Sequence, residues 1–177
     1  MRCFIAIELD SSFRFKIAEI QNRLAEDAIK PVEPQNLHLT LKFLGDMSEE
    51  NVNEVVKVLS TIKFDAFEME LSGIGVFPST DRINVIWIGA TGRVSELVRE
   101  INLQLTKIGI PEDDRAFEAH LTIARVKRKP EKLKERLKAL ENIHIGAQKV
   151  TSFVLKKSTL TSQGPIYEDV RKFELVK

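Results

Sequence analysis

Two copies of one four-residue pattern, His38-Leu39-Thr40-Leu41 and His120-Leu121-Thr122-Ile123, constrain this sequence more than any other feature. In each copy, apolar residues alternate with polar ones, which is the pattern of a strand with one buried and one accessible face. The aliphatic side chains would anchor the strand in a core, and the imidazole and the hydroxyl would share the other face. The chain has only three histidines and nine threonines, so chance seldom produces such a pair. We therefore expect two matched strands that form one site.

The residue types on the accessible face suit acid and base chemistry. A histidine has an ordinary pKa of about 6.5, so one member of a pair can accept a proton while the other donates one near neutral pH. Threonine hydroxyls can donate hydrogen bonds to an oxyanion held between them. A single histidine on a strand is more often an ordinary surface or core residue. No threonine follows His144 at the same spacing, and we expect it on the polar face of a strand or loop. The duplication is what favours catalysis.

Strand-like and helix-like segments alternate twice along the chain. The expected strands are residues 2–9, 37–44, 64–74, 85–88, the second tetrad, 148–160 and 166–176, with a hairpin loop over 75–84. The expected helices follow Asp10 and Ser48, span 94–108, and begin at Pro130. An order of strand, helix, motif strand and helix that occurs twice predicts two similar α+β lobes, with the tetrads facing a cleft between them.

Composition excludes several classes of protein. A chain of 177 residues can bury enough apolar surface to fold without a covalent staple, and its one cysteine, Cys3, cannot form an internal disulfide. No apolar run approaches the roughly 20 residues of a membrane span. The net charge of +1 gives no global attraction for nucleic acid, so affinity for an anion must be local. We expect a cytoplasmic protein without a membrane contact.

The tetrads resemble the paired His-x-Thr-x signature of the 2H phosphoesterase superfamily. Further blocks, spread over nearly the whole chain, resemble its LigT-like branch, the RNA 2',3'-cyclic phosphodiesterases. These blocks are residues 2–7, 38–45, Phe77-Pro78 with 85–89, 120–126, and Ser158 with Gly164-Pro165 and Tyr167.

The resemblance implies a more detailed fold and an activity. The fold is α+β: a single bilobal domain, 1–177, with two pseudo-symmetric lobes, each a mainly antiparallel β-sheet with outer helices, around a central cleft. The activity is hydrolysis of an RNA terminal 2',3'-cyclic phosphate to a 2'-phosphomonoester without a metal or cofactor, with 2'-5' RNA ligation as a related reaction in the reverse sense. Carried over by position, His38 would donate a proton and His120 would accept one, and Thr40 and Thr122 would contact phosphate oxygens.

Two cations and one aromatic residue are further candidates for substrate binding. Lys42 has the strand parity of His38, so a regular strand would place it on the reacting face. Arg125 has the parity of Leu121 and reaches that face only through a bulge or at the end of the strand. Family members often have an arginine there, so the resemblance favours Arg125 and strand geometry favours Lys42. Tyr167, beside a turn, is a candidate for stacking on a base.

A basic run follows the second tetrad and could track an RNA backbone. An ordinary solvated helix face, partly neutralised by Glu131 and Glu135, is the alternative. The run comprises Lys127, Arg128, Lys129, Lys132, Lys134, Arg136 and Lys138.

Two other functions are compatible with the tetrads. The histidines could bind a metal ion, although no H-E-x-x-H motif accompanies them and threonine is a poor zinc ligand. The protein could also be a non-catalytic RNA-end binding module. The expected partners are RNA ends that carry a 2',3'-cyclic phosphate, of which tRNA-derived ends are one source, and we expect a monomer.

Overall fold

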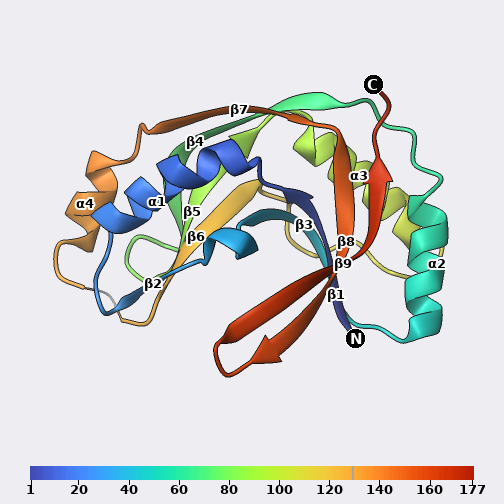
Figure 1. Ribbon diagram of the computed structural model, residues 1–177, viewed down its shortest axis with the longest axis horizontal. Coiled ribbons are helices and arrows are strands. Elements are labelled where there is room, and N and C mark those ends of the chain that lie inside the picture. Colours follow the sequence, from blue (N-terminus) through green and yellow to red (C-terminus); the bar gives the residue numbers. More distant parts are fainter. Residues whose placement is uncertain (129) are drawn as a thin grey trace.

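The computed structural model describes residues 1–128 and 130–177, which build two antiparallel sheets (Figure 1). In spatial order, the first sheet contains β3 (His38–Asp46), β1 (Arg2–Glu8), β8 (Ser152–Thr161) and β9 (Gly164–Glu174). The second contains β2 (Ile29–Pro31), β6 (His120–Val126), β5 (Ile83–Thr91), β4 (Phe67–Pro78) and β7 (His144–Val150). The predicted α+β class with two mainly antiparallel sheets is confirmed.

The two sheets repeat one arrangement around the motif strands. The order β3-β1-β8 in the first sheet corresponds to β6-β5-β4 in the second, and the short strand β2 adds to the outer side of β6. The aliphatic residues of both tetrads are buried, as the alternation predicts: Leu39, Leu41, Leu121 and Ile123. Buried hydrophobic side chains from both sheets form one cluster, so each motif strand is anchored in a common core.

The α-helices in the described part of the chain lie outside the sheets (Figure 1). They are α1 (Arg14–Arg23), α2 (Glu49–Leu59), α3 (Val94–Thr106) and α4 (Leu133–Ala139), with 3-10 turns at Ser11–Phe13 and Pro34–Asn36. The side chain of Ser48 caps α2 by accepting a hydrogen bond from the Asn51 amide at 3.1 Å. Among the described residues, none of these helices is long and apolar enough to cross a membrane.

Three sequence expectations about element boundaries are wrong. The segment expected as a hairpin loop is mostly strand, because β4 continues to Pro78 and Gly75 still pairs with Trp87 of β5. The expected strand 148–160 is two strands in different sheets, since β7 ends at Val150 and β8 begins at Ser152. The last helix begins at Leu133 rather than Pro130.

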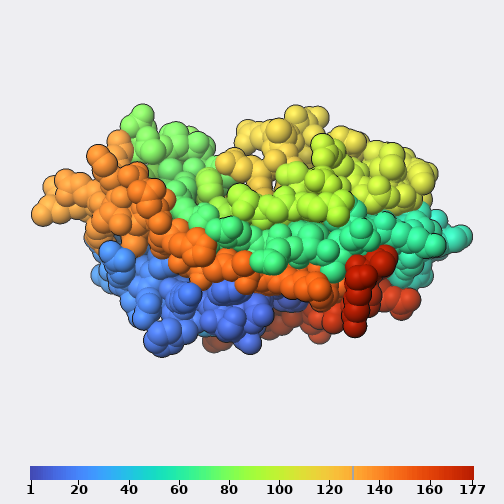
Figure 2. Space-filling model, turned by 90° about the horizontal axis from the view of Figure 1, so that it is seen from above, coloured from blue at the N-terminus to red at the C-terminus, as the bar shows by residue number. Residues whose placement is uncertain are grey.

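Polar side chains join the two sheets at the end of β1. The Gln148 side chain of β7 donates to the Glu8 carbonyl at 2.8 Å and accepts from the Asp10 amide at 2.9 Å. From α1, Gln21 Nε2 donates to the Ile123 carbonyl of β6 at 2.9 Å. Figure 2 shows the β7 segment, in orange, crossing the molecule between the N-terminal segment in blue and β4 in green. The Gln148 bonds thus join the second sheet to the end of β1, and the Gln21 bond ties α1 to the second motif strand.

Two leucines of α3 test where the core lies. Leu97 is 0% exposed and Leu103 is 54% exposed, and both belong to the same helix. We expect Leu97→Ala to lower the free energy of unfolding by about 2–5 kcal/mol, because it empties a packed site. Leu103→Ala, the matched control, should change it by no more than about 0.5 kcal/mol. Denaturant titration measures both, and equal losses would contradict this packing.

Candidate active site

One cavity of about 500 Å³ lies between the two motif strands. All the candidate residues except Lys42 line it: His38, Thr40, His120, Thr122, Arg125 and Tyr167. The first pair comes from β3, the next three residues from β6 and Tyr167 from β9. Residues that lie far apart in the sequence therefore meet around one space.

A backbone carbonyl orients each imidazole. The Nδ1 atom of His38 lies 2.7 Å from the Asn36 carbonyl oxygen, and the Nδ1 atom of His120 lies 2.7 Å from that of Glu118. Since a carbonyl only accepts hydrogen bonds, Nδ1 carries the proton in both neutral rings, and the lone pair is on Nε2. Each Nε2 atom can therefore accept a proton, or donate one once the ring is charged.

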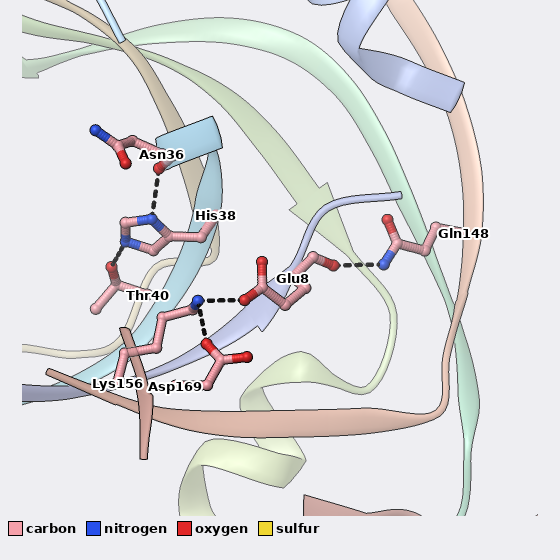
Figure 3. A network of polar contacts seen from close by, with 7 residues as sticks. All are labelled: Glu8, Asn36, His38, Thr40, Gln148, Lys156 and Asp169. Carbon is pink, nitrogen blue, oxygen red and sulfur yellow. Dashed lines mark hydrogen bonds and ion pairs between the residues drawn. The ribbon is translucent and has the colours of Figure 1, made fainter. Parts of the chain in front are cut away.

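The two threonines differ in their contact with the neighbouring histidine. The Oγ1 atom of Thr40 lies 2.9 Å from Nε2 of His38, so the hydroxyl donates to the neutral ring (Figure 3). Among the described residues, no such hydrogen bond joins Thr122 to His120. The hydroxyl of Thr40 thus occupies the proton-accepting atom of His38 in the free protein.

An extra residue interrupts β3 after Thr40. Ala6 of β1 pairs with Thr40 and the adjacent Ile5 pairs with Lys42, so Leu41 is inserted between them. A bulge of this kind reverses the alternation of side chains beyond it. The expectation that Lys42 shares the face of Thr40 is therefore wrong, because it assumed a regular strand.

Lys42 is buried outside the cavity, with 3% of its surface exposed. Its Nζ atom donates to the Pro111 carbonyl at 3.0 Å and lies 3.4 Å from a carboxylate oxygen of Asp113. Both partners belong to the segment between α3 and β6. Lys42 thus holds the segment that leads to the second tetrad.

β6 contains the same bulge at the equivalent place. Trp87 and Ile86 are adjacent on β5, but their partners on β6 are separated by the extra residue Ile123. The insertion turns Arg125 into the cavity, as the family resemblance implied, and Phe43 takes the equivalent place in β3. Both motif strands therefore direct a third side chain into the cavity, at a position that regular alternation would place on the opposite face.

Aromatic rings flank both imidazoles. Tyr167 packs edge-on against His38 with 5.2 Å between ring centroids, and Phe4 lies 4.9 Å from the same imidazole. Around His120, the corresponding centroid distances are 4.9 Å for Phe77 and 5.9 Å for Trp87. These rings limit how far either imidazole can turn.

The environment of the cavity alters two titrating groups. Burial lowers the pKa of His38, and the charges of Lys156 and Arg125 lower it further, against the Asn36 carbonyl and Glu8, which raise it. Burial raises the pKa of Tyr167, although Arg125 and Lys156 act in the opposite direction. His38 therefore favours its neutral form in the free protein, and Tyr167 keeps its phenolic proton.

Comparison with known proteins decides the family. The model of the LigT like phosphoesterases matches residues 7–87 and 89–167, and each matched segment contains one tetrad. The chain belongs to the LigT-like phosphoesterase family. A relative named RNA 2',3'-cyclic phosphodiesterase, from Archaeoglobus fulgidus, is 38% identical over 177 residues, which cover 98% of this chain and 100% of the relative.

Solved structures of LigT-like proteins share the fold. The protein TT0787 of Thermus thermophilus has a TM-score of 0.87 at 28% identity, and the match covers 98% of this chain and 97% of that one. LigT of Escherichia coli complexed with 3'-AMP has a TM-score of 0.82 at 26% identity, with 99% and 98% covered. The arrangement of two antiparallel sheets with outer helices is thus the LigT-like fold.

Sequence reasoning missed other residues around this LigT-like cavity. Lys30 of β2 pairs with Arg125, and Arg2 of β1 pairs with Ser158 of β8; all four line the cavity. Because β2 is only three residues long, no local pattern marks it. Together with Arg125, these two basic side chains give the cavity a positive lining that suits an anion, with Glu33 as an acidic neighbour.

Two other sequence hypotheses concern metal ions and the basic run. Among the residues that the structure describes, no group of three or more His, Cys, Asp or Glu side chains could hold a metal ion. In the basic run, Lys134 pairs with Asp81 at 3.0 Å and Arg136 pairs with Glu26, whereas Lys129 lies outside the described residues. No described residue of the run lines the cavity.

The lowered pKa of His38 predicts a pH-dependent stability. In the unfolded chain this pKa returns to about 6.5, so between the two values the unfolded state binds more protons. The stabilisation is complete above the unfolded value and is lost as the pH falls through the folded value. We expect the difference in unfolding free energy between the natural protein and the His38→Asn variant to shrink from about pH 7.5 to about pH 5. Denaturant titrations across that range measure it, and a constant or growing difference would refute the expectation.

Proposed function

We propose that this protein hydrolyses a 2',3'-cyclic phosphate at an RNA end to a 2'-phosphomonoester, with two histidines as general acid and base and without a metal ion. The observation that carries the proposal is the shared cavity, in which both imidazoles have Nδ1 bound to a backbone carbonyl. The name of the Archaeoglobus relative supports the substrate. The positive lining suits the phosphate.

The proposed reaction needs one proton transfer on each side of phosphorus. His120 removes a proton from water, the resulting oxygen nucleophile attacks phosphorus, and the bond from phosphorus to the 3' oxygen breaks in line with the attack. The protonated form of His38 donates its proton to that 3' oxygen, which leaves a 2'-phosphate beside a 3'-hydroxyl. The lowered pKa of His38 makes this form less populated in the free protein but a stronger acid. Each transfer is typically worth about 10² to 10⁴ in rate. Ligation would follow the same steps with a 5'-hydroxyl in place of water as the nucleophile, and would form a 2'-5' phosphodiester.

Three side chains are proposed to hold the phosphate oxygens, and a fourth is proposed to contact the substrate beside them. Thr40 and Thr122 follow the histidines on the same face, so their hydroxyls can donate to oxygens that gain charge in the transition state. Arg125 adds a fixed positive charge with several donors. Tyr167, which keeps its proton, contributes an aromatic face and one further donor.

The cellular setting is part of the same proposal. The proposed catalytic and binding residues all belong to one chain, and we propose that the protein acts as a monomer. One buried cysteine, Cys3, suits the reducing cytoplasm. RNA ends with a 2',3'-cyclic phosphate arise wherever the 2'-hydroxyl is the attacking group in RNA cleavage, and we propose tRNA-derived ends as one source.

The product of a short RNA with a 2',3'-cyclic phosphate tests the function. We expect a 2'-phosphate, formed at the same rate after exhaustive chelation, and a loss of about 10² or more in kcat for His38→Ala and His120→Ala. Chromatography against synthetic 2'- and 3'-phosphate standards identifies the product. A 3'-phosphate would contradict the proposed in-line geometry, and binding without turnover would favour the non-catalytic RNA-end module.

Arg125 and Lys42 provide a matched pair of cation substitutions. Because only Arg125 faces the cavity, Arg125→Met should lower kcat/KM for the cyclic phosphate by about tenfold or more while the protein stays folded. Lys42→Met should lower the free energy of unfolding, because the Pro111 carbonyl loses its donor, and should leave KM unchanged in the folded protein. Steady-state kinetics with denaturant titration of both variants checks this, and the reverse pattern would show that strand parity was the better guide.

A further inference from the structure

The register of the strands places equivalent residues beside the two histidines. Glu8 of β1 pairs with His38, and Gly89 of β5 pairs with His120. Since β1 and β5 hold the same place next to their motif strands, Glu8 and Gly89 are equivalent positions. One imidazole therefore has a carboxylate as its cross-strand neighbour, and the other has no side chain there.

The next strand outward repeats this contrast. Lys156 of β8 pairs with Phe4, and Phe77 of β4 pairs with Val85. Phe4 and Val85 are equivalent, because each pairs with the third cavity residue of its motif strand. Lys156 and Phe77 thus occupy matching places. The first sheet therefore has the charged side chain of Lys156 at the place where the second sheet has the ring of Phe77, which packs on His120.

Lys156 is held firmly although it carries a charge. It is 8% exposed, its Nζ atom donates to Asp169 at 2.7 Å, and it forms an ion pair with Glu8. Figure 3 shows this cluster beside His38, and shows the Gln148 side chain bound to the Glu8 carbonyl. Lys156 does not line the cavity, so it acts on His38 without touching a substrate.

We propose that Lys156 is a positioning residue that, held by Glu8 and Asp169 beside His38, adds to the difference between the two matched histidines by placing a positive charge near one of them. The inference rests on the proposed function for its kinetic consequence only, because the charge acts on His38 in the free protein. Glu8 works in the opposite direction, so the ion pair sets a balance between two charges of opposite sign.

Groups from several elements enter this balance. Burial lowers its pKa most, Lys156 from β8 and Arg125 from β6 lower it further, and the Asn36 carbonyl and Glu8 from β1 raise it. Tyr167 from β9 contacts the ring edge-on and stays neutral.

Lys156 keeps its own charge where His38 titrates. Burial alone would lower the pKa of Lys156, but the hydrogen bonds to Asp169 and Glu8 outweigh burial and raise it. The ammonium is therefore a fixed charge over the pH range in which a histidine gains or loses a proton. Beside His120, the corresponding place is taken by the uncharged ring of Phe77.

Substitution of each charge has a predicted sign. In NMR titrations of the free protein, which has only three histidines, Lys156→Met should raise the pKa of His38 by about half a unit or more, and Glu8→Gln should lower it. Lys156→Arg keeps the charge and should restore the natural value. Lys157→Met, on the same strand and paired with Glu168, is the control and should leave His38 unchanged. An unchanged pKa in Lys156→Met, or shifts of the same sign in Lys156→Met and Glu8→Gln, would overturn the inference.

The pH profile of kcat/KM separates this inference from the proposed function. If His38 donates the proton, Lys156→Met should move the basic limb of the profile to higher pH, Glu8→Gln should move it to lower pH, and the acidic limb should stay. Movement of the acidic limb instead would support the action of Lys156 and assign His38 as the base. NMR shifts of the predicted signs without any turnover would sustain the inference and refute the hydrolase, whereas turnover without those shifts would do the opposite.

Discussion

A regular strand presents only every second residue to one face, and both motif strands exceed that limit through one inserted residue. The bulges at Leu41 and Ile123 let a histidine, a threonine and a third side chain reach the same cavity from each strand. The backbone of the second bulge is hydrogen-bonded, because the Ile123 carbonyl accepts from the Gln21 side chain and from the Val32 amide, each at 2.9 Å. The segment around α1 and β2 thus stabilises the irregularity on which the site depends.

Much of the fold follows from patterns confined to short segments. The motif strands, α2 and α3 lie where alternation or helical spacing predicted them, since their buried faces repeat within a few residues. The corner at Thr151, where the chain passes from one sheet to the other, could not be predicted from an apolar run that continues through it. Residues 75–84 carry turn-forming residues that favour a loop, but Gly75 remains in β4 and accommodates the indole of Trp87.

In the site, too, residues within a short motif could be predicted from the sequence, and residues whose roles depend on distant strands could not. The histidines and threonines were predictable because each pair is a motif of three residues, and the duplication implied that the copies meet. Strand parity predicted the wrong face for Lys42, because a bulge leaves no mark in the sequence. Lys30 and the cluster around Lys156 were missed, because their roles depend on partners in distant strands.

The buried ammonium of Lys42 links the assembly of the two lobes. Its strand belongs to the first tetrad, yet its acceptor, the Pro111 carbonyl, precedes the second. Burial of an ammonium is costly unless it keeps a hydrogen-bond acceptor, so the segment before β6 has to be in place when Lys42 leaves water. The packing of the first motif strand is thereby coupled to the placement of the chain that leads into the second.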